Sequence, residues 1–154
     1  MTWLPLLGTL MGAVIALTSA LLVEYRRDRR EERVERHKAK QEAYARYLAA
    51  HAEVRTQLRV LSVASGLTDE DRGYRAFKAY ASCYASRYEL AVLAPQAVLT
   101  PAGNLDGHAR DLRDVVIEGA TVEAQGGGRM REYLETLKLV QAAMRADLGA
   151  DSIS

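Results

Sequence analysis

The hydrophobic and polar positions divide the chain into an uncharged start and a longer amphipathic remainder. Residues 2–23 carry no charged side chain. At 1.5 Å per residue, a helix of this length spans about 33 Å, close to the ~30 Å hydrocarbon core of a bilayer. Trp3 and Tyr25 stand at its two ends, where aromatic residues favour the membrane interface. We therefore expect a transmembrane anchor over residues 1–24.

A cleaved signal peptide and a buried soluble helix are the competing interpretations of this start. A signal peptide begins with basic residues and ends its apolar core at a small-residue site. Here no Lys or Arg precedes the apolar run, which continues through residues 21–23 after the small residues at 18–20. Arginines follow the span instead, and the positive-inside rule then places the rest of the chain in the cytoplasm. These arginines are Arg26, Arg27, Arg29, Arg30, Arg33 and Arg36.

Small residues recur at every fourth position within the predicted anchor. Such a face lets two helix backbones approach closely in a membrane, so it favours a homo-oligomer. The alternative is that Gly and Ala are simply common in membrane helices. The predicted helix-association face consists of Gly8, Gly12, Ala16 and Ala20.

The connector over residues 25–42 is densely charged, and on a helix its basic and acidic residues fall on nearly opposite faces. The basic stripe could contact anionic lipid headgroups. A parallel pair of chains meeting near Val34 would instead set one acidic stripe against the other chain's basic stripe. The third interpretation is a solvated linker helix. Because acids lie among the bases and the net charge is only +1, we expect no nucleic-acid partner.

Residues 43–154 show helical periodicity, which predicts a cytoplasmic helical bundle. The predicted fold is all-α: a long helix continues from the anchor and packs with about three further helices as an antiparallel bundle. Thr68 with Asp71 is a capping signature for the second helix, which Pro95 ends. We expect a connection over the segment "APQAVLTPAGN", residues 94–104, which could include one helical turn, and then the third helix over about 104–118. The predicted buried positions are Tyr44, Tyr47, Leu48, His51, Val54, Leu58 and Leu61 on the first helix, Tyr74, Phe77, Ala81, Tyr84, Tyr88 and Ala91 on the second, Leu105, Ala109, Leu112, Val115 and Val116 on the third, and Met130, Tyr133, Leu134, Leu137, Val140, Met144 and Leu148 on the fourth.

Residues that could carry chemistry are few and scattered. None of His37, His51 and His108 has the carboxylate–histidine spacing of a metal site, and we expect His51 at the core edge. Cys83 is the single cysteine, so it forms no intramolecular disulfide, and we expect a buried thiol. The Gly-rich run at 126–129 lacks the rest of a phosphate loop and predicts a hinge. We therefore expect no enzyme activity, cofactor or metal.

Tyrosine is the unusual residue class, with eight tyrosines against one phenylalanine. Tyr80, Tyr84 and Tyr88 follow one another at i, i+4 spacing. They could form an adhesive surface, because tyrosine supplies contact area and a hydroxyl at low entropic cost. Alternatively, the rings build the bundle core, with their hydroxyls at its rim. These three tyrosines are the candidate interaction surface.

The apolar Gly/Ala-rich start, the Arg-rich flank, "EAYARYLAAH" and "AAMRADLG" resemble small uncharacterised membrane proteins of actinobacteria such as streptomycetes. That resemblance implies a single-pass anchor and a cytoplasmic helical domain. We therefore expect a non-enzymatic, membrane-anchored interaction or scaffold protein that self-associates, contacts membrane lipid and binds an unknown protein partner. The alternatives are a membrane effector that opens a pore or perturbs the bilayer, of the toxin or phage-defence type, and a small-ligand sensor with a site between the helices near Tyr84, Tyr88 and His51.

Overall fold

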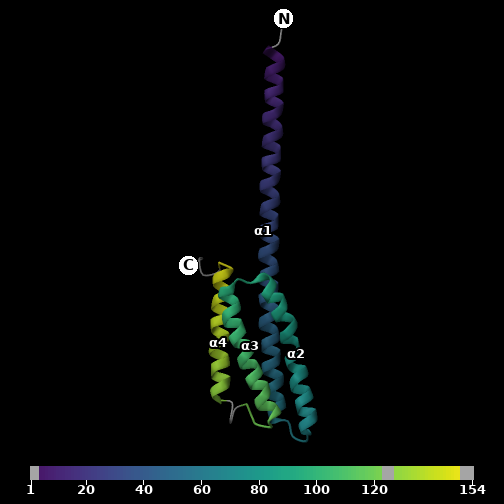
Figure 1. Cartoon of the computed structure of the whole chain (residues 1–154), viewed down its shortest axis with the longest axis vertical. Helices are drawn as coiled ribbons and strands as arrows, with labels where there is room; N and C mark the ends of the chain where they lie inside the picture. The colour runs from purple at the N-terminus through teal and green to yellow at the C-terminus, as the bar shows by residue number, and fades with distance from the viewer. Residues whose placement is uncertain (1–3, 123–126, 150–154) are drawn as a thin grey trace. The chain divides into compact units, whose positions relative to one another are not determined.

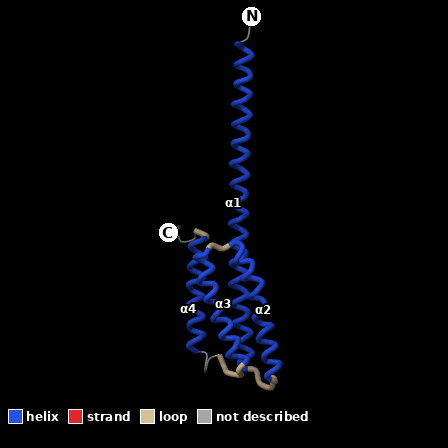
Figure 2. Tube along the Cα trace, in the orientation of Figure 1, coloured by secondary structure: helices blue, strands red, loops and turns tan. Residues whose placement is uncertain are grey.

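The computed structural model describes the backbone of residues 4–122 and 127–149, and the side chains from residue 24 onward within these ranges. Helices and loops, without a strand, make up these described ranges (Figure 2). The four helices are α1 (Leu4–Val63), α2 (Asp69–Leu93), α3 (Gln96–Ile117) and α4 (Gly127–Asp147). The predicted all-α fold is therefore confirmed.

The chain separates into two compact units, residues 1–38 and 39–154. In the second unit, the C-terminal part of α1 and the helices α2, α3 and α4 lie side by side, and consecutive helices run in opposite directions (Figure 1). This is the up-down order that short loops impose on neighbouring helices. The predicted bundle of the C-terminal part of α1 with three further helices is therefore observed.

The start of α2 follows from local chemistry. Thr68 is the N-cap residue, and its hydroxyl accepts a hydrogen bond from the Asp71 backbone amide at 3.1 Å. The first turn holds Asp69, Glu70 and Asp71, whose negative charges favour the positive end of the helix dipole. Gly66 adopts a φ of 80° between α1 and α2, a conformation that glycine reaches without a steric penalty. The predicted capping signature is confirmed.

The predicted start of the third helix was wrong, because α3 begins at Gln96 rather than near residue 104. Pro95 occupies the N-cap, where its missing amide costs nothing, and Pro101 lies inside the helix. A proline there removes one backbone hydrogen bond and costs about 3 kcal/mol in an exposed helix. Val98 and Ala102, near Pro101 in the sequence, are buried, and burial of apolar surface favours the helix despite the proline.

The predicted core positions on α1, α3 and most of α4 match the structure. On α1, six of the seven predicted residues are buried and Leu48 packs partly buried against them; all five on α3 are buried. On α4, Leu134 is the error, since it is 36% exposed. The fully buried predicted residues on α4 are Tyr133, Val140 and Met144, and Met130, Leu137 and Leu148 pack partly buried against the core.

The predicted buried face of α2 was wrong. Its stripe of large aromatic residues points to solvent, with Tyr74 at 67% and Tyr88 at 72% exposure. The observed inner face is built mostly from small residues, which let α2 approach its neighbours closely, and it includes one aromatic ring, Tyr80. Its members are Ala76, Ala79, Tyr80, Cys83, Ser86 and Leu90.

Among the described residues, no helix combines the length and the apolar character needed to cross a membrane. The predicted anchor falls on residues 1–24, where the structure describes a helical backbone from Leu4 onward but no side chain before residue 24. The side chains of the predicted helix-association face, Gly8, Gly12, Ala16 and Ala20, lie outside the described part.

Candidate functional site

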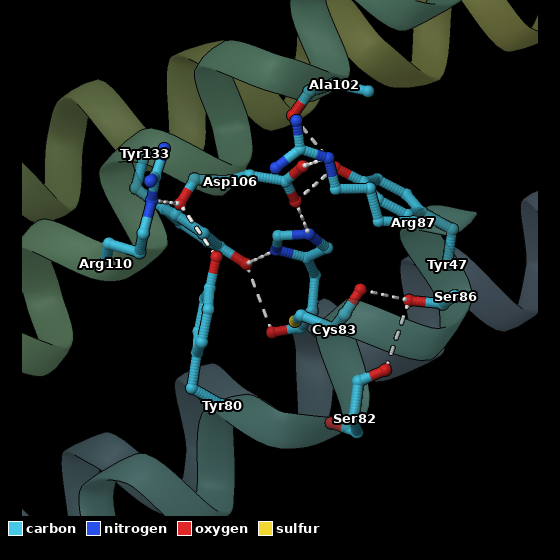
Figure 3. A network of polar contacts seen from close by, with 11 residues as sticks. Tyr47, Tyr80, Ser82, Cys83, Ser86, Arg87, Ala102, Asp106, Arg110 and Tyr133 are labelled. Carbon is cyan, nitrogen blue, oxygen red and sulfur yellow. Dashed lines mark hydrogen bonds and ion pairs between the residues drawn. The ribbon is translucent and has the colours of Figure 1, made fainter. Parts of the chain in front are cut away.

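A buried carboxylate on α3 is the centre of a polar network inside the bundle (Figure 3). The side chain of Asp106 is 1% exposed, and its Oδ1 atom accepts a hydrogen bond from the Tyr47 hydroxyl at 3.0 Å. The same oxygen lies 3.0 Å from Nε2 of His51, whose side chain is 0% exposed. The Tyr47 hydroxyl is also 3.0 Å from the Ala102 carbonyl oxygen. Helices α1 and α3 are thus joined by polar contacts in an otherwise apolar interior.

The network continues from His51 to α4. The Tyr133 hydroxyl lies 3.3 Å from Nδ1 of His51 and donates to the His51 carbonyl oxygen at 3.1 Å. With Nε2–H donating to Asp106, the other ring nitrogen faces the Tyr133 oxygen. A hydroxyl has a single proton, so Tyr133 can donate to only one of these two acceptors at a time, and the shorter contact is the one to the His51 carbonyl oxygen. Asp106 and Tyr133 thus lie against the two ring nitrogens of His51.

Helix α2 joins the network through two side chains. The Tyr80 hydroxyl donates to the Asp106 carbonyl oxygen at 3.2 Å. Arg87, with a half-exposed side chain, places Nε 3.4 Å from Oδ2 of Asp106. This contact is an ion pair whose geometry falls short of a hydrogen bond, since Oδ2 has no hydrogen-bond partner among the described residues. Side chains of α1 and α2 therefore meet at Asp106 of α3, and α4 joins the network through the contact of Tyr133 with His51.

Burial sets the protonation of the hydroxyls and the thiol around this carboxylate. Burial, followed by the charge of Asp106, raises the pKa of Tyr80 to about 12 and that of Cys83 to about 12. The same two causes raise the pKa of Tyr47 above its ordinary value, and burial raises that of Tyr133. The hydroxyls therefore remain neutral donors, and the thiol stays protonated rather than forming the reactive thiolate.

The order carboxylate, imidazole, hydroxyl along Asp106, His51 and Tyr133 is also the order of a catalytic triad. In a triad, however, the hydroxyl must reach a substrate. Tyr133 is 1% exposed, and its hydroxyl already donates to a backbone carbonyl. The arrangement holds helices together and offers no nucleophile to solvent. His51 is buried with most of its predicted stripe on α1, but it lies inside the core rather than at the predicted edge, because its side chain is 0% exposed. The predicted buried thiol of Cys83 is confirmed.

A second polar contact ties α4 to α1. Lys40 donates to both carboxylate oxygens of Asp147, at 2.9 and 3.2 Å, and the Tyr44 hydroxyl donates to Oδ2 of Asp147 at 2.6 Å. Burial and the Asp147 carboxylate raise the pKa of Tyr44. We name Lys40, Tyr44 and Asp147 the α1–α4 clasp.

Two grooves flank the exposed edge of α1. One, of about 470 Å³, lies between α1 and α2 and has Leu61, Ala79 and Lys78 in its lining. The other, of about 350 Å³, includes Met130 of α4. His51, Tyr84 and Tyr88, the residues predicted for a small-ligand site, line neither of these two grooves. The structure does not bring those three residues together at either one.

The outer side of α2 carries large apolar side chains along its whole length. Phe77 is 56% exposed and Tyr84 48% exposed. The Tyr84 ring packs edge-on against Tyr80 with centroids 5.1 Å apart, and the Arg113 guanidinium lies 4.7 Å from the Phe77 ring centroid. Two of the three predicted interaction residues, Tyr84 and Tyr88, are exposed here, whereas Tyr80 is buried. We define the α2 aromatic face as Tyr74, Phe77, Tyr84, Tyr88 and Val92.

The six arginines predicted to flank the membrane are all exposed on α1. Arg27 forms an ion pair with Glu31 at 2.9 Å, and Arg29 lies over the Tyr25 ring. Val34, the centre of the predicted pairing of two chains, is 68% exposed.

Asp106 is the central residue that the sequence interpretation missed. Together with Ala102, Leu105 and Ala109 it occupies the i, i+3, i+4, i+7 positions of the buried stripe on α3. An acidic residue in an otherwise apolar stripe, together with Tyr47 and His51 in the predicted stripe of α1, was the sequence signal that could have predicted a buried polar network. Groups of three or more metal-binding side chains are absent from the described residues.

Comparison with known proteins finds no matching family model, curated protein or solved structure. Inferences about function therefore rest on two features of the bundle itself. One is the Asp106 network in the interior, and the other is the α2 aromatic face outside.

Proposed function

We propose that this chain is a non-enzymatic, membrane-anchored helical interaction protein, whose contact surface is the α2 aromatic face. The observation that carries the proposal is the exposure of four aromatic rings along one helix, between 48% and 72% each. At about 200 Å² per ring, they present roughly 500 Å² of mostly apolar surface. The largest exposed apolar patch of a folded domain is commonly about this size, and such a patch is often functional.

The α2 aromatic face is held in place before any partner arrives. Tyr84 rests on the buried Tyr80 ring, and Arg113 stacks on Phe77. Below them, Tyr80 and Arg87 tie α2 to Asp106 of α3. Side chains that are already ordered lose little entropy on binding, which favours affinity.

The chemistry of the interior supports the non-enzymatic part of the proposal. The hydroxyls and the thiol nearest Asp106 are buried, and their raised pKa values keep them protonated. A nucleophile or general base needs access to substrate and a pKa near the working pH. The buried hydroxyls and the thiol of the Asp106 network meet neither condition, which supports a role for the network in holding the outer surface in place.

The membrane part of the proposal rests on the uncharged residues 2–23 and on the exposed arginines that follow them. Residues 1–24 would anchor the chain, with the bundle on the cytoplasmic side. The connector arginines would lie near anionic headgroups, at roughly 1 kcal/mol for each basic residue close to the surface.

The proposal is tested by photocrosslinking in intact cells. A benzophenone-bearing phenylalanine analogue replaces Tyr88 on the α2 aromatic face. In a matched variant it replaces Leu139, which is 63% exposed on α4. We expect protein adducts from position 88, lost when Tyr74→Ser is added, and none from position 139. Equal adducts from both positions, or none from position 88, would contradict the contact surface.

The anchor has a separate test in the same cells. The full chain should stay in the membrane fraction after extraction at alkaline pH, and a chain lacking residues 1–24 should be released. Release of the full chain would overturn the anchor and leave the contact surface to be judged by the crosslinks.

A further inference from the structure

We infer that the groove between α1 and α2 binds a medium-chain fatty-acid anion, with its carboxylate held by Arg75 and Lys78 and its tail lying along Leu61 and Ala79. The groove has a volume of about 470 Å³, within the range of about 300–1,000 Å³ that small-molecule sites occupy. None of the described residues that line it belongs to the α2 aromatic face. The inference therefore goes beyond the proposed function, and each can fail without the other.

Most of the surface that lines the groove is apolar. Leu61 is 9% exposed and Ala79 is 5% exposed, and both are core residues. Val60 lines the same groove and is 61% exposed. An apolar tail lying there would cover surface that water now contacts, and burial of apolar surface is favourable.

Two cations of α2 line this groove. Arg75 and Lys78 stand three residues apart, so they are neighbours on the helix surface, and both are exposed. Within the described part of the chain, neither side chain forms an ion pair or a hydrogen bond. An anionic ligand would therefore meet two charges that no acid neutralises, and a guanidinium can hold a carboxylate by two parallel hydrogen bonds.

The charges also favour one orientation of the ligand. Helices α1 and α2 run in opposite directions (Figure 1), so Arg75 lies at the Leu61 end of the groove and Ser82 at the Glu53 end. Glu53 is the one acid among the described lining residues, and its charge repels a carboxylate from that end. The carboxylate therefore lies at the cations, and the tail runs toward Ser82.

The length of the groove limits the tail. Its lining extends along α1 from Glu53 to Leu61, which is about 12 Å at a rise of 1.5 Å per residue. An extended alkyl chain advances about 1.25 Å per carbon, so about ten carbons span this distance. Decanoate is therefore the probe.

Protection of an introduced cysteine from alkylation tests the site on the full-length chain in nanodiscs of zwitterionic lipid. Ser82→Cys places a thiol at the tail end of the groove, and decanoate at about 1 mM should slow its reaction with a maleimide roughly fivefold or more. The unchanged chain should not react, because Cys83 is 2% exposed. Ala142→Cys, at an exposed alanine of α4, is the matched control and should react at the same rate with and without decanoate.

The role of the cations is tested in the Ser82→Cys chain. Arg75→Gln with Lys78→Gln should raise the decanoate concentration for half-maximal protection by about tenfold or more. Arg131→Gln with Lys138→Gln removes two exposed cations of α4 and should leave that concentration unchanged. Decanol, which has the same tail and no charge, should protect about tenfold less well.

Three results would overturn the inference. Absence of protection at Ser82→Cys would show that the groove does not take the tail. Equal slowing at Ala142→Cys would show a general effect of the fatty acid. Equal protection by decanol, or equal effects of the two double variants, would show that the cations hold no carboxylate. The photocrosslinks from position 88 judge the α2 aromatic face separately.

Discussion

Oδ1 of Asp106 lies 3.0 Å from Nε2 of His51, and the two side chains are 1% and 0% exposed. Taking such a pair out of water is costly, and the cost is offset only when its remaining polar atoms are bonded. Tyr47 of α1 donates to the same carboxylate oxygen, and Tyr133 of α4 lies 3.3 Å from the other ring nitrogen. The second carboxylate oxygen, Oδ2, is compensated by its ion pair with Arg87 of α2. A shift of any of these helices by one residue would separate the partners, so the pair penalises alternative packings of the bundle.

Removing the carboxylate should strongly destabilise the bundle. We expect Asp106→Ala to lower the free energy of unfolding by about 3–5 kcal/mol, because the polar groups of His51, Tyr47 and Arg87 lose their shared partner. Urea denaturation of the full-length chain in detergent, followed by far-UV circular dichroism, measures the change. Asp111→Ala on the exposed side of α3 is the control and should stay within about 0.5 kcal/mol. Equal effects from the two variants would contradict the role of Asp106.

The orientation of α2 predicts opposite outcomes for two tyrosines eight residues apart. Tyr80→Ser should cost about 3 kcal/mol, because it empties a site that is 2% exposed. Tyr88→Ser removes a ring that is 72% exposed and should change stability by less than about 0.5 kcal/mol. The same denaturation experiment applies, at a protein concentration where the chain is monomeric. A larger loss of stability from Tyr88→Ser than from Tyr80→Ser would contradict this orientation, because it would mean that the large aromatic stripe of α2 faces the core.

The stability of the bundle should fall as the pH rises into the alkaline range, because burial raises the pKa values of the Cys83 thiol and the Tyr80 hydroxyl in the folded state. Below about pH 9 the folded and unfolded chains both keep the Cys83 proton. Between about 9 and 12 the unfolded chain loses that proton while the folded chain retains it, so stability falls as pH rises. Tyr80 adds to the fall between about 10 and 12, and each such group contributes about 1.4 kcal/mol per pH unit.

Stability measured from pH 8 to 11 checks this expectation. Cys83→Ala should make the slope between pH 9 and 10 shallower by about 1.4 kcal/mol per unit, whatever its effect at neutral pH. An unchanged slope would show that the thiol is not held protonated.

Two glycines on either side of the α3 C-terminus should respond in opposite directions to alanine. Gly119 has a φ of 76°, and an added Cβ would lie 3.0 Å from the Arg72 guanidinium, so Gly119→Ala should destabilise the bundle by about 1 kcal/mol. Gly107 lies within α3, where an added Cβ meets nothing within 4 Å. Gly107→Ala should stabilise by about 0.5–1 kcal/mol. Thermal melting of both variants measures the contrast, and two shifts of the same sign would contradict it.

Features that depend on neighbouring residues were predictable before the structure was known. The ends of α2 follow from Thr68 and Pro95, and the buried faces of α1 and α3 follow from apolar residues at helical spacing. Periodicity, caps and turns act within a few residues of the chain, so they can be read before any packing is known.

Tertiary structure decided the rest. Large aromatic and small residues form two different stripes on α2, and helical periodicity alone favoured the aromatic stripe as the buried face. In the structure the small residues Ala76, Ala79 and Cys83 face the core, because they let α2 pack closely against its neighbours. Pro101 was compatible with a helix only once burial on both sides compensated for its missing hydrogen bond. Asp106 became a central residue because α1 and α2 bring polar groups to it and Tyr133 of α4 contacts its partner His51. These outcomes depend on contacts between residues far apart in the chain, and burial and polar satisfaction are properties of such contacts.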